Sequence, residues 1–248
     1  MRKASLLLIM VVFAGTSFAQ IRIAPEVGLN IGGMSRTVED IDIPLLGSVS
    51  ISTENKTRVG FRAGLIADIP VAENVAVQPG IFYSTQAVKT NFTVFILDIS
   101  QTLKVNYLLV PVNVLYKFGT PDKGRFFVGA GPYFGYAFGG TSDIEDPNGI
   151  LTGLAGGNTG GTLPAIESGD ISIGSDTMDS AKPFDFGLNF NLGYELPQGV
   201  FVRGQFGLGL ANTAPIESYK QKNWGMTISV GYLIGFNKKG NKEEPVSN

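Results

Sequence analysis

Large apolar side chains alternate with polar residues or glycine in about eight segments of this chain. In the clearest segment, residues 184–196, every even-numbered residue from Phe184 to Leu196 is large and apolar, and the odd-numbered residues are Asp, Gly, Asn or Glu. Because successive side chains of a β-strand point to opposite faces, each segment is expected to form a strand with one apolar and one polar face. The pattern predicts an all-β protein.

The predicted strands follow one another with turn-forming residues between them. They fall at residues 21–32, 58–69, 75–86, 103–118, 126–138, 184–196, 200–210 and 224–236. In the fourth, the apolar residues change parity, since Leu103 and Tyr107 are odd-numbered but Val110 and Tyr116 are even-numbered. An extra residue in a strand reverses the faces of those that follow, so we expect a β-bulge near Leu108 or Leu109.

The size of an eight-stranded barrel decides which face points outward. Its interior is just wide enough to be filled by side chains, and roughly fifty bulky apolar residues cannot fit there. The apolar face must therefore meet lipid, and strands of about 11 to 13 residues are long enough for a tilted bilayer crossing. We predict an eight-stranded antiparallel up-and-down transmembrane β-barrel, whose closure leaves no unpaired backbone in lipid.

Connector lengths alternate between short and long, as in outer-membrane barrels, where short turns are periplasmic and long loops extracellular. The short connectors are residues 70–74, 119–124 and 197–199, and the long ones are 34–57, 87–102, 139–182 and 212–223. An even number of strands places both termini in the periplasm. The expected location is the bacterial outer membrane.

The N-terminus has the three parts of an export signal: basic Arg2 and Lys3, an apolar run, and small residues at Ser17 and Ala19. We expect residues 1–19 to be a cleaved signal peptide, 20–237 the barrel domain and 238–248 a disordered periplasmic tail. Subtracting Arg2 and Lys3 from the 19 basic residues, against 21 acidic ones, leaves a net charge of −4. This charge argues against nucleic acid as a partner.

The chain contains neither histidine nor cysteine. Without histidine, a serine–histidine hydrolase mechanism is closed, and without cysteine there is no lipid anchor of the lipoprotein kind, no disulfide and no thiolate metal site. We therefore expect no enzymatic activity and no cofactor; a mechanism that uses carboxylates alone stays open, but no pair of carboxylates is singled out by its spacing. The charged residues predicted to face the lumen form either a structural plug, which we favour because isolated charges in a closed interior are costly, or a selectivity path. They are Arg22, Glu26, Arg58, Arg62, Asp68, Asp185, Glu195 and Arg203.

The long connector 139–182 is rich in acidic residues. Carboxylates are calcium ligands, which makes Asp143, Glu145 and Asp146 candidates, although acidic glycine-rich loops are more often simply solvated. The same connector also carries several Ile and Leu residues, more than a disordered segment would hold. We expect it to extend as a β-hairpin above the membrane or to bind a protein or glycan partner.

Short phrases on successive predicted strands resemble a known family, the PorT-like outer-membrane β-barrel proteins common in Bacteroidetes. The resemblance runs from about residue 21 to 236. It implies a membrane barrel and, through PorT itself, a role in protein secretion across the outer membrane. Leu109 departs from the family pattern, where a polar residue such as Glu is common. The phrases are Gly28-Leu29-Asn30-Ile31, Gly60-Phe61-Arg62-Ala63-Gly64-Leu65, Val77-Gln78-Pro79-Gly80-Ile81-Phe82-Tyr83-Ser84, Tyr107-Leu108-Leu109-Val110-Pro111-Val112, Gly129-Ala130-Gly131-Pro132-Tyr133 and Asp185-Phe186-Gly187-Leu188-Asn189.

Three functions follow as hypotheses. The first is a non-enzymatic barrel with a structural role or a role in interaction at the cell surface through its loops. The second is an accessory to secretion or outer-membrane assembly that resembles PorT. The third is a narrow channel for small solutes. The barrel is expected to be a monomer surrounded by outer-membrane lipid, because eight strands close without a second copy.

Overall fold

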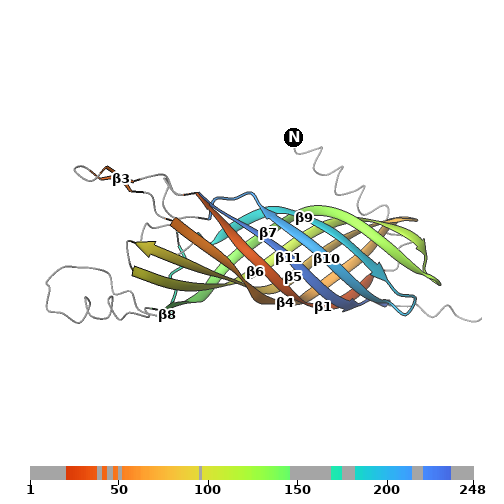
Figure 1. The fold of residues 1–248 in the computed structure, drawn as a ribbon. Coiled ribbons are helices and arrows are strands. Elements are labelled where there is room, and N and C mark those ends of the chain that lie inside the picture. Colours follow the sequence, from red (N-terminus) through yellow and green to blue (C-terminus); the bar gives the residue numbers. More distant parts are fainter. Residues whose placement is uncertain are drawn as a thin grey trace, which may run out of the picture.

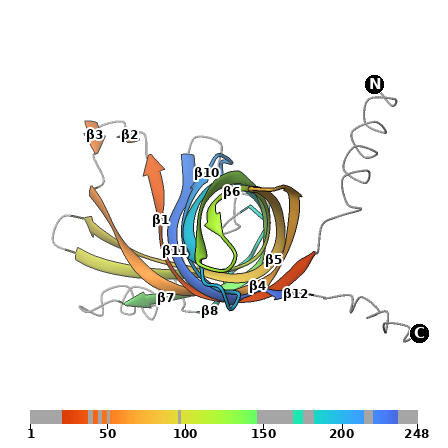
Figure 2. The ribbon, with the colours of Figure 1, turned by 90° about the vertical axis from the view of Figure 1, so that its right-hand side faces the viewer.

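Eight long strands form one closed antiparallel sheet in the computed structural model of the chain, which describes residues 21–37, 41–43, 47–49, 52–94, 97–145, 169–174, 182–213 and 220–235 (Figure 1). Each strand pairs with its neighbour in the chain, and β1 also pairs with β11, which closes the ring seen end-on in Figure 2. The predicted eight-stranded up-and-down barrel is confirmed. The strands are β1 (Arg22–Thr37), β4 (Ser52–Ala72), β5 (Val75–Val94), β6 (Leu97–Thr120), β7 (Gly124–Glu145), β9 (Phe184–Glu195), β10 (Val200–Gly209) and β11 (Lys220–Tyr232).

Four short strands complete the part of the fold that the structure describes. β2 (Ile41–Ile43) and β3 (Gly47–Val49) pair with each other in a separate two-stranded sheet. β8 (Gly169–Asp170) pairs with the end of β7, and β12 (Ile234–Gly235) continues the pairing of β11 along β1.

Some predicted segments cannot be compared with the structure. The expected signal peptide 1–19 and tail 238–248 lie outside the described residues, as does most of the connector 139–182 beyond Glu145. Among the described residues, no helix is both long and apolar enough to cross a membrane.

Side chains alternate between a lipid-facing belt and the lumen along every strand. On β9, Phe184 is 70% exposed and Leu192 65%, whereas the intervening Asp185 and Asn189 are buried. On β11, Ile228 is 66% exposed between the buried Thr227 and Ser229. The apolar face points outward, as predicted from the size of the lumen.

The bulge predicted near Leu108 or Leu109 is wrong. The pairing of β6 with β5 runs without a shift from Val75↔Tyr116 to Val94↔Leu97. Odd-numbered residues of β6 from Leu103 to Lys117 face the lumen, so Leu103 and Tyr107 are buried inside while Lys104 and Leu108 are exposed. The parity of the apolar residues changes because the outer part of the lumen is itself apolar.

A register shift does occur beside this point, but in β7. Asn106 of β6 pairs with Gly139, and the next residue, Tyr107, pairs with Ala137, which leaves Phe138 as the extra residue. β4 is irregular as well, between Thr57 and Arg62 and between Pro70 and Ala72.

The three short turns lie at the end of the barrel where β1 begins and β11 ends. Gly119, Gly124 and Gly199 adopt positive φ angles of 101°, 93° and 90° there, a conformation that L side chains rarely adopt. Because the short turns of outer-membrane barrels are periplasmic, this end faces the periplasm and the opposite end faces outward.

The strands β4 to β7 extend into residues expected to be loops. β5 and β6 run through most of 87–102, and β1 and β4 take up both ends of 34–57. These extensions contain β-branched residues such as Thr90, Thr93 and Ile99, which favour strands. Alternation does not mark them because, beyond the bilayer, no face of a strand has to meet lipid.

An arginine on the lipid face tests the membrane position of the barrel. Ile228 lies four residues from both Trp224 and Tyr232, near the bilayer midplane, whereas Val71 lies beside the periplasmic turn. We expect Ile228→Arg to lower the free energy of unfolding in lipid vesicles by about 2–4 kcal/mol and Val71→Arg by about 0–1 kcal/mol. Equal effects in a urea titration would contradict this placement.

Candidate functional sites in the lumen and at the outer rim

The lumen is filled by distinct layers of side chains from the periplasmic end outward. An ion cluster comes first, then an apolar layer with two arginines stacked on aromatic rings, then a polar cavity, and finally a second apolar layer.

The ion cluster is built around the carboxylates of Asp68 and Glu195. Asp68 is fully buried and accepts hydrogen bonds from Lys117 Nζ at 2.8 Å, from Gln78 Nε2 at 2.7 Å and from Arg22. Glu195 accepts from Arg22 Nη1 at 2.5 Å, from Arg125 Nη2 at 2.7 Å and from Lys117 Nζ at 3.3 Å. Each carboxylate thus has at least two cationic partners, which offsets the cost of burying it.

Seven apolar residues pack just outward of the ion cluster: Ala24, Ile66, Phe82, Leu115, Phe127, Phe201 and Leu233.

Arg62 and Arg203 lie on the aromatic rings of this layer. The guanidinium carbon of Arg62 is 3.6 Å from the ring centre of Phe82, and that of Arg203 is 5.3 Å from the ring centre of Phe201. Arg203 also donates to Gln78 Oε1 at 2.7 Å and lies 3.6 Å from Glu26. Cation–π contacts of desolvated guanidinium groups contribute on the order of 2 kcal/mol, so the rings stabilise these buried charges.

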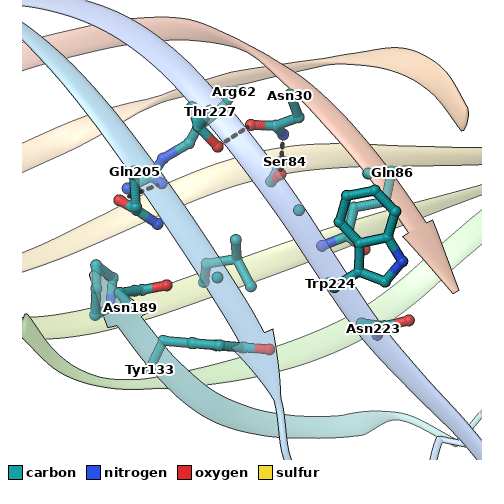
Figure 3. Close-up of a pocket in the computed structure, with 15 residues that line it drawn as sticks. Asn30, Arg62, Ser84, Gln86, Tyr133, Asn189, Gln205, Asn223, Trp224 and Thr227 are labelled. Carbon is teal, nitrogen blue, oxygen red and sulfur yellow. Dashed lines mark hydrogen bonds between the residues drawn. The ribbon is translucent and has the colours of Figure 1, made fainter. Parts of the chain in front are cut away.

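A cavity of about 50 Å³ lies next to Arg62 (Figure 3). Its lining is mostly neutral and polar. Asn30 is held in place there, because its Nδ2 donates to Ser84 Oγ at 2.7 Å and its Oδ1 accepts from Thr227 Oγ1 at 2.7 Å. Arg62 and Gln205 lie at one end of the cavity, and Tyr133 and Asn223 at the other.

The outer layer of the lumen is apolar and covered. Ile171 and Ile173, from the described part of the connector 139–182, pack against this layer. The polar cavity therefore lies between two layers that contain apolar side chains. The outer layer consists of Val88, Leu103, Val105, Tyr107 and Ala137, with Leu109 packed against it.

The eight charged residues predicted for the lumen fall in different places. Arg22, Asp68 and Glu195 meet in the ion cluster, and Glu26, Arg62 and Arg203 meet in the layer above it. Asp185 lies apart near the outer end, where its Oδ2 accepts from Tyr133 at 3.2 Å and from Asn223 at 3.0 Å. Arg58 is exposed and does not line the closed lumen.

Two cations of the ion cluster, Lys117 and Arg125, were not predicted. Lys117 has the same parity as Asn113 and lies between the outward-facing Tyr116 and Phe118, so alternation by itself places it in the lumen. Arg125 directly follows the turn residue Gly124, where the alternation of β7 has only begun.

Two of the three calcium candidates form ion pairs with lysines at the outer rim. Glu145 lies 2.6 Å from Lys89 Nζ and Asp143 lies 3.4 Å from Lys104 Nζ, while Asp146 is outside the described residues. Within the ranges that the structure describes, no three acidic side chains are grouped as metal ligands.

The fold and the closed lumen define an outer-membrane barrel, and comparison with known families identifies the family to which it belongs. Residues 17–215 match the family described as outer membrane protein beta-barrel domain. The chain belongs to this family and is located in the bacterial outer membrane. A search of curated proteins finds no match.

Solved outer-membrane structures are similar to this chain at low sequence identity. The chain is similar to the outer membrane protein OprG from Pseudomonas aeruginosa, with 13% identity and a TM-score of 0.50, over 88% of this chain and 97% of that one. It is also similar to Neisserial surface protein A, with 12% identity, a TM-score of 0.39 and coverage of 85% and 96%. Ail of Yersinia pestis, solved with the heparin analogue sucrose octasulfate, matches at 10% identity and a TM-score of 0.36, with coverage of 86% and 99%. At this identity, the likeness to OprG shows the fold alone.

Neutralising Asp68 tests whether the ion cluster holds the barrel together. We expect Asp68→Asn to lower the free energy of unfolding by about 3–5 kcal/mol, because Lys117 and Arg22 lose a fully buried carboxylate. The matched control is Asp143→Asn in the exposed pair with Lys104, which should change it by no more than about 1 kcal/mol. Similar losses in the two variants would mean that the cluster is dispensable.

Proposed function

We propose that this protein is a non-enzymatic surface barrel that contacts a protein or glycan partner through the outer ends of β4 to β7. The observation that supports this is the unequal length of the strands. β4 to β7 have 20 to 24 residues, whereas β9, β10 and β11 have 10 to 13. One side of the barrel is therefore much taller than the other, as Figure 1 shows.

The height of the tall side is greater than a bilayer needs. At about 3.3 Å per residue and a tilt of about 40°, the 24 residues of β6 rise about 60 Å along the barrel axis. The 10 residues of β10 rise about 25 Å, which is the height of the apolar band of such barrels. About 35 Å of the height of β6 is thus left for contacts outside the membrane.

The lumen gives less support to the alternative of a narrow channel for small solutes. The ion cluster lies on the periplasmic side of the polar cavity, and an apolar layer covered by Ile171 and Ile173 lies on its outer side. Steady single-channel conductance in planar bilayers would favour the channel instead.

The second alternative is an accessory to secretion or assembly that resembles PorT, from a species of Bacteroidetes. It rests on the phrases shared with that family, such as residues 107–112 at the centre of β6. Such an accessory would meet its partners in the periplasm, so the side of the membrane on which contacts form separates the two proposals.

Trimming the tall hairpin tests the proposal. Asn91 pairs with Ser100, so residues 91–100 can be replaced by an Asn-Gly turn without breaking the pairs nearer the membrane. With a photo-crosslinking amino acid at Asp143, we expect intact cells to give crosslinks to a surface protein or polysaccharide, and the trimmed variant to lose at least about nine tenths of them.

Two controls accompany this experiment. A crosslinker at Asp122, in the periplasmic turn, should give none of the same products, and heat-modified gel migration should show that the trimmed barrel still folds. Crosslinks that persist after trimming, or that form chiefly at Asp122 to secretion components, would contradict surface binding and favour the accessory role.

A further inference from the structure

Three glycines lie side by side on the lumen face of neighbouring strands and form one wall of the cavity. Gly225 of β11 pairs with Gly207 of β10 on one side and with Gly32 of β1 on the other. All three line the cavity. A row of three residues without side chains leaves a hollow in a lumen that is otherwise filled.

Backbone packing leaves room for a side chain at Gly225, and at Gly32 and Gly207 a neighbouring atom would have to move by only a few tenths of an ångström. A Cβ atom at Gly225 would have its nearest heavy atoms at 3.7 Å, and at Gly32 or Gly207 at 3.3 Å. At Gly187 or Gly129, in contrast, a Cβ atom would clash with a carbonyl of the adjacent strand. The hollow beside these three glycines is therefore not forced by close backbone packing, and larger side chains at these positions would fill it.

The charge of the lining is positive. Fifteen described residues line the cavity, and Arg62 is the one charged residue among them. Its side chain is 2% exposed, and its Nη1 donates to Gln205 Oε1 at 2.9 Å, but Nε and Nη2 have no hydrogen-bond partner. Within the described chain, no carboxylate forms an ion pair with Arg62 within 4 Å; the nearby Glu26 lies 3.6 Å from Arg203.

Neutral hydrogen-bond donors complete the lining. Ser84 accepts a bond from Asn30, so its own hydroxyl proton can point into the cavity, and the amides of Gln86, Asn189 and Gln205 lie around the same space. A buried guanidinium with unpaired nitrogens, surrounded by amide and hydroxyl donors, offers an anion hydrogen bonds that replace those of its hydration shell.

We propose that this cavity binds a small anion, of the size of chloride or of a one- or two-carbon carboxylate. A volume of about 50 Å³ holds about three or four water molecules, which limits the ligand to that size. The bound anion balances the charge of Arg62. This balance is needed because Arg62 and Arg203 share a single nearby carboxylate, that of Glu26. The anion also joins β4, β9 and β10 across the lumen through Arg62, Asn189 and Gln205.

The chain provides its own probe, because it has a single tryptophan and Trp224 is among the lining residues. The purified protein in detergent is titrated with sodium chloride, formate or acetate, and sodium gluconate keeps the ionic strength constant. We expect a saturable change in Trp224 emission and a rise in the thermal midpoint with the three small anions. Gluconate, which is too large for the cavity, should produce neither.

Two variants and a matched control separate binding from general salt effects. Arg62→Met should weaken the apparent affinity at least about tenfold. Gly225→Val should abolish the response by filling the cavity, and it keeps the test valid if the Arg62 variant does not fold. Gly204→Val adds the same side chain on the outward face of β10, where a Cβ atom has 3.7 Å of room, and should leave the response unchanged.

The proposal is overturned if no saturable response occurs up to molar chloride, or if both Arg62→Met and Gly225→Val respond as the natural chain does. A crystal soaked in bromide gives a direct check, since an anomalous peak beside Arg62 supports the site. Peaks confined to the protein surface contradict it.

Discussion

The pairing of β1 with β11 is the constraint on which the rest of the structure depends. It closes the sheet, so that strands in lipid have no edge of unpaired backbone groups, which hydrocarbon cannot satisfy. Closure at eight strands also fixes the size of the lumen. Large residues such as Phe184 and Ile228 must then face outward, and the charged residues of the same strands are forced into a narrow interior. There they are stable only in contact with one another, as Asp68 is with Lys117.

The lumen consequently behaves as a protein core. Its periplasmic end is held by ion pairs, its outer end by apolar packing under Ile171 and Ile173, and the cavity between them is small. Under the proposed function, the contacts specific to this protein form outside the membrane, where β4 to β7 continue as paired strands. Their backbone hydrogen bonds give the outer hairpins a defined shape without support from lipid.

The sequence predicts the membrane part of the fold well, because lipid on one face of each strand enforces alternation, as on β9. The prediction from sequence fails where lipid does not enforce this alternation. Leu103 and Tyr107 were assigned to the wrong face because they are apolar residues inside the lumen, and the outer hairpins were missed because alternation fades beyond the bilayer. Six of the eight predicted lumen charges lie in the ion cluster or in the layer above it. Their pairing depends on the register of the strands, which alternation does not reveal. Gly225 and Gly187 look alike in sequence, and their different roles depend on neighbouring strands.

The most direct test of this account is the labelling of single cysteines in intact cells, which is feasible because the natural chain has no cysteine. Cysteine is introduced at Asp143 on the outer rim, at Asp122 in a short turn and at Ser84 in the lumen, and a membrane-impermeant maleimide is added. The account predicts labelling at position 143 in intact cells, at 122 only after the outer membrane is permeabilised, and at 84 in neither case. Labelling of position 122 in intact cells, or rapid labelling of position 84, would contradict the orientation or the closed lumen.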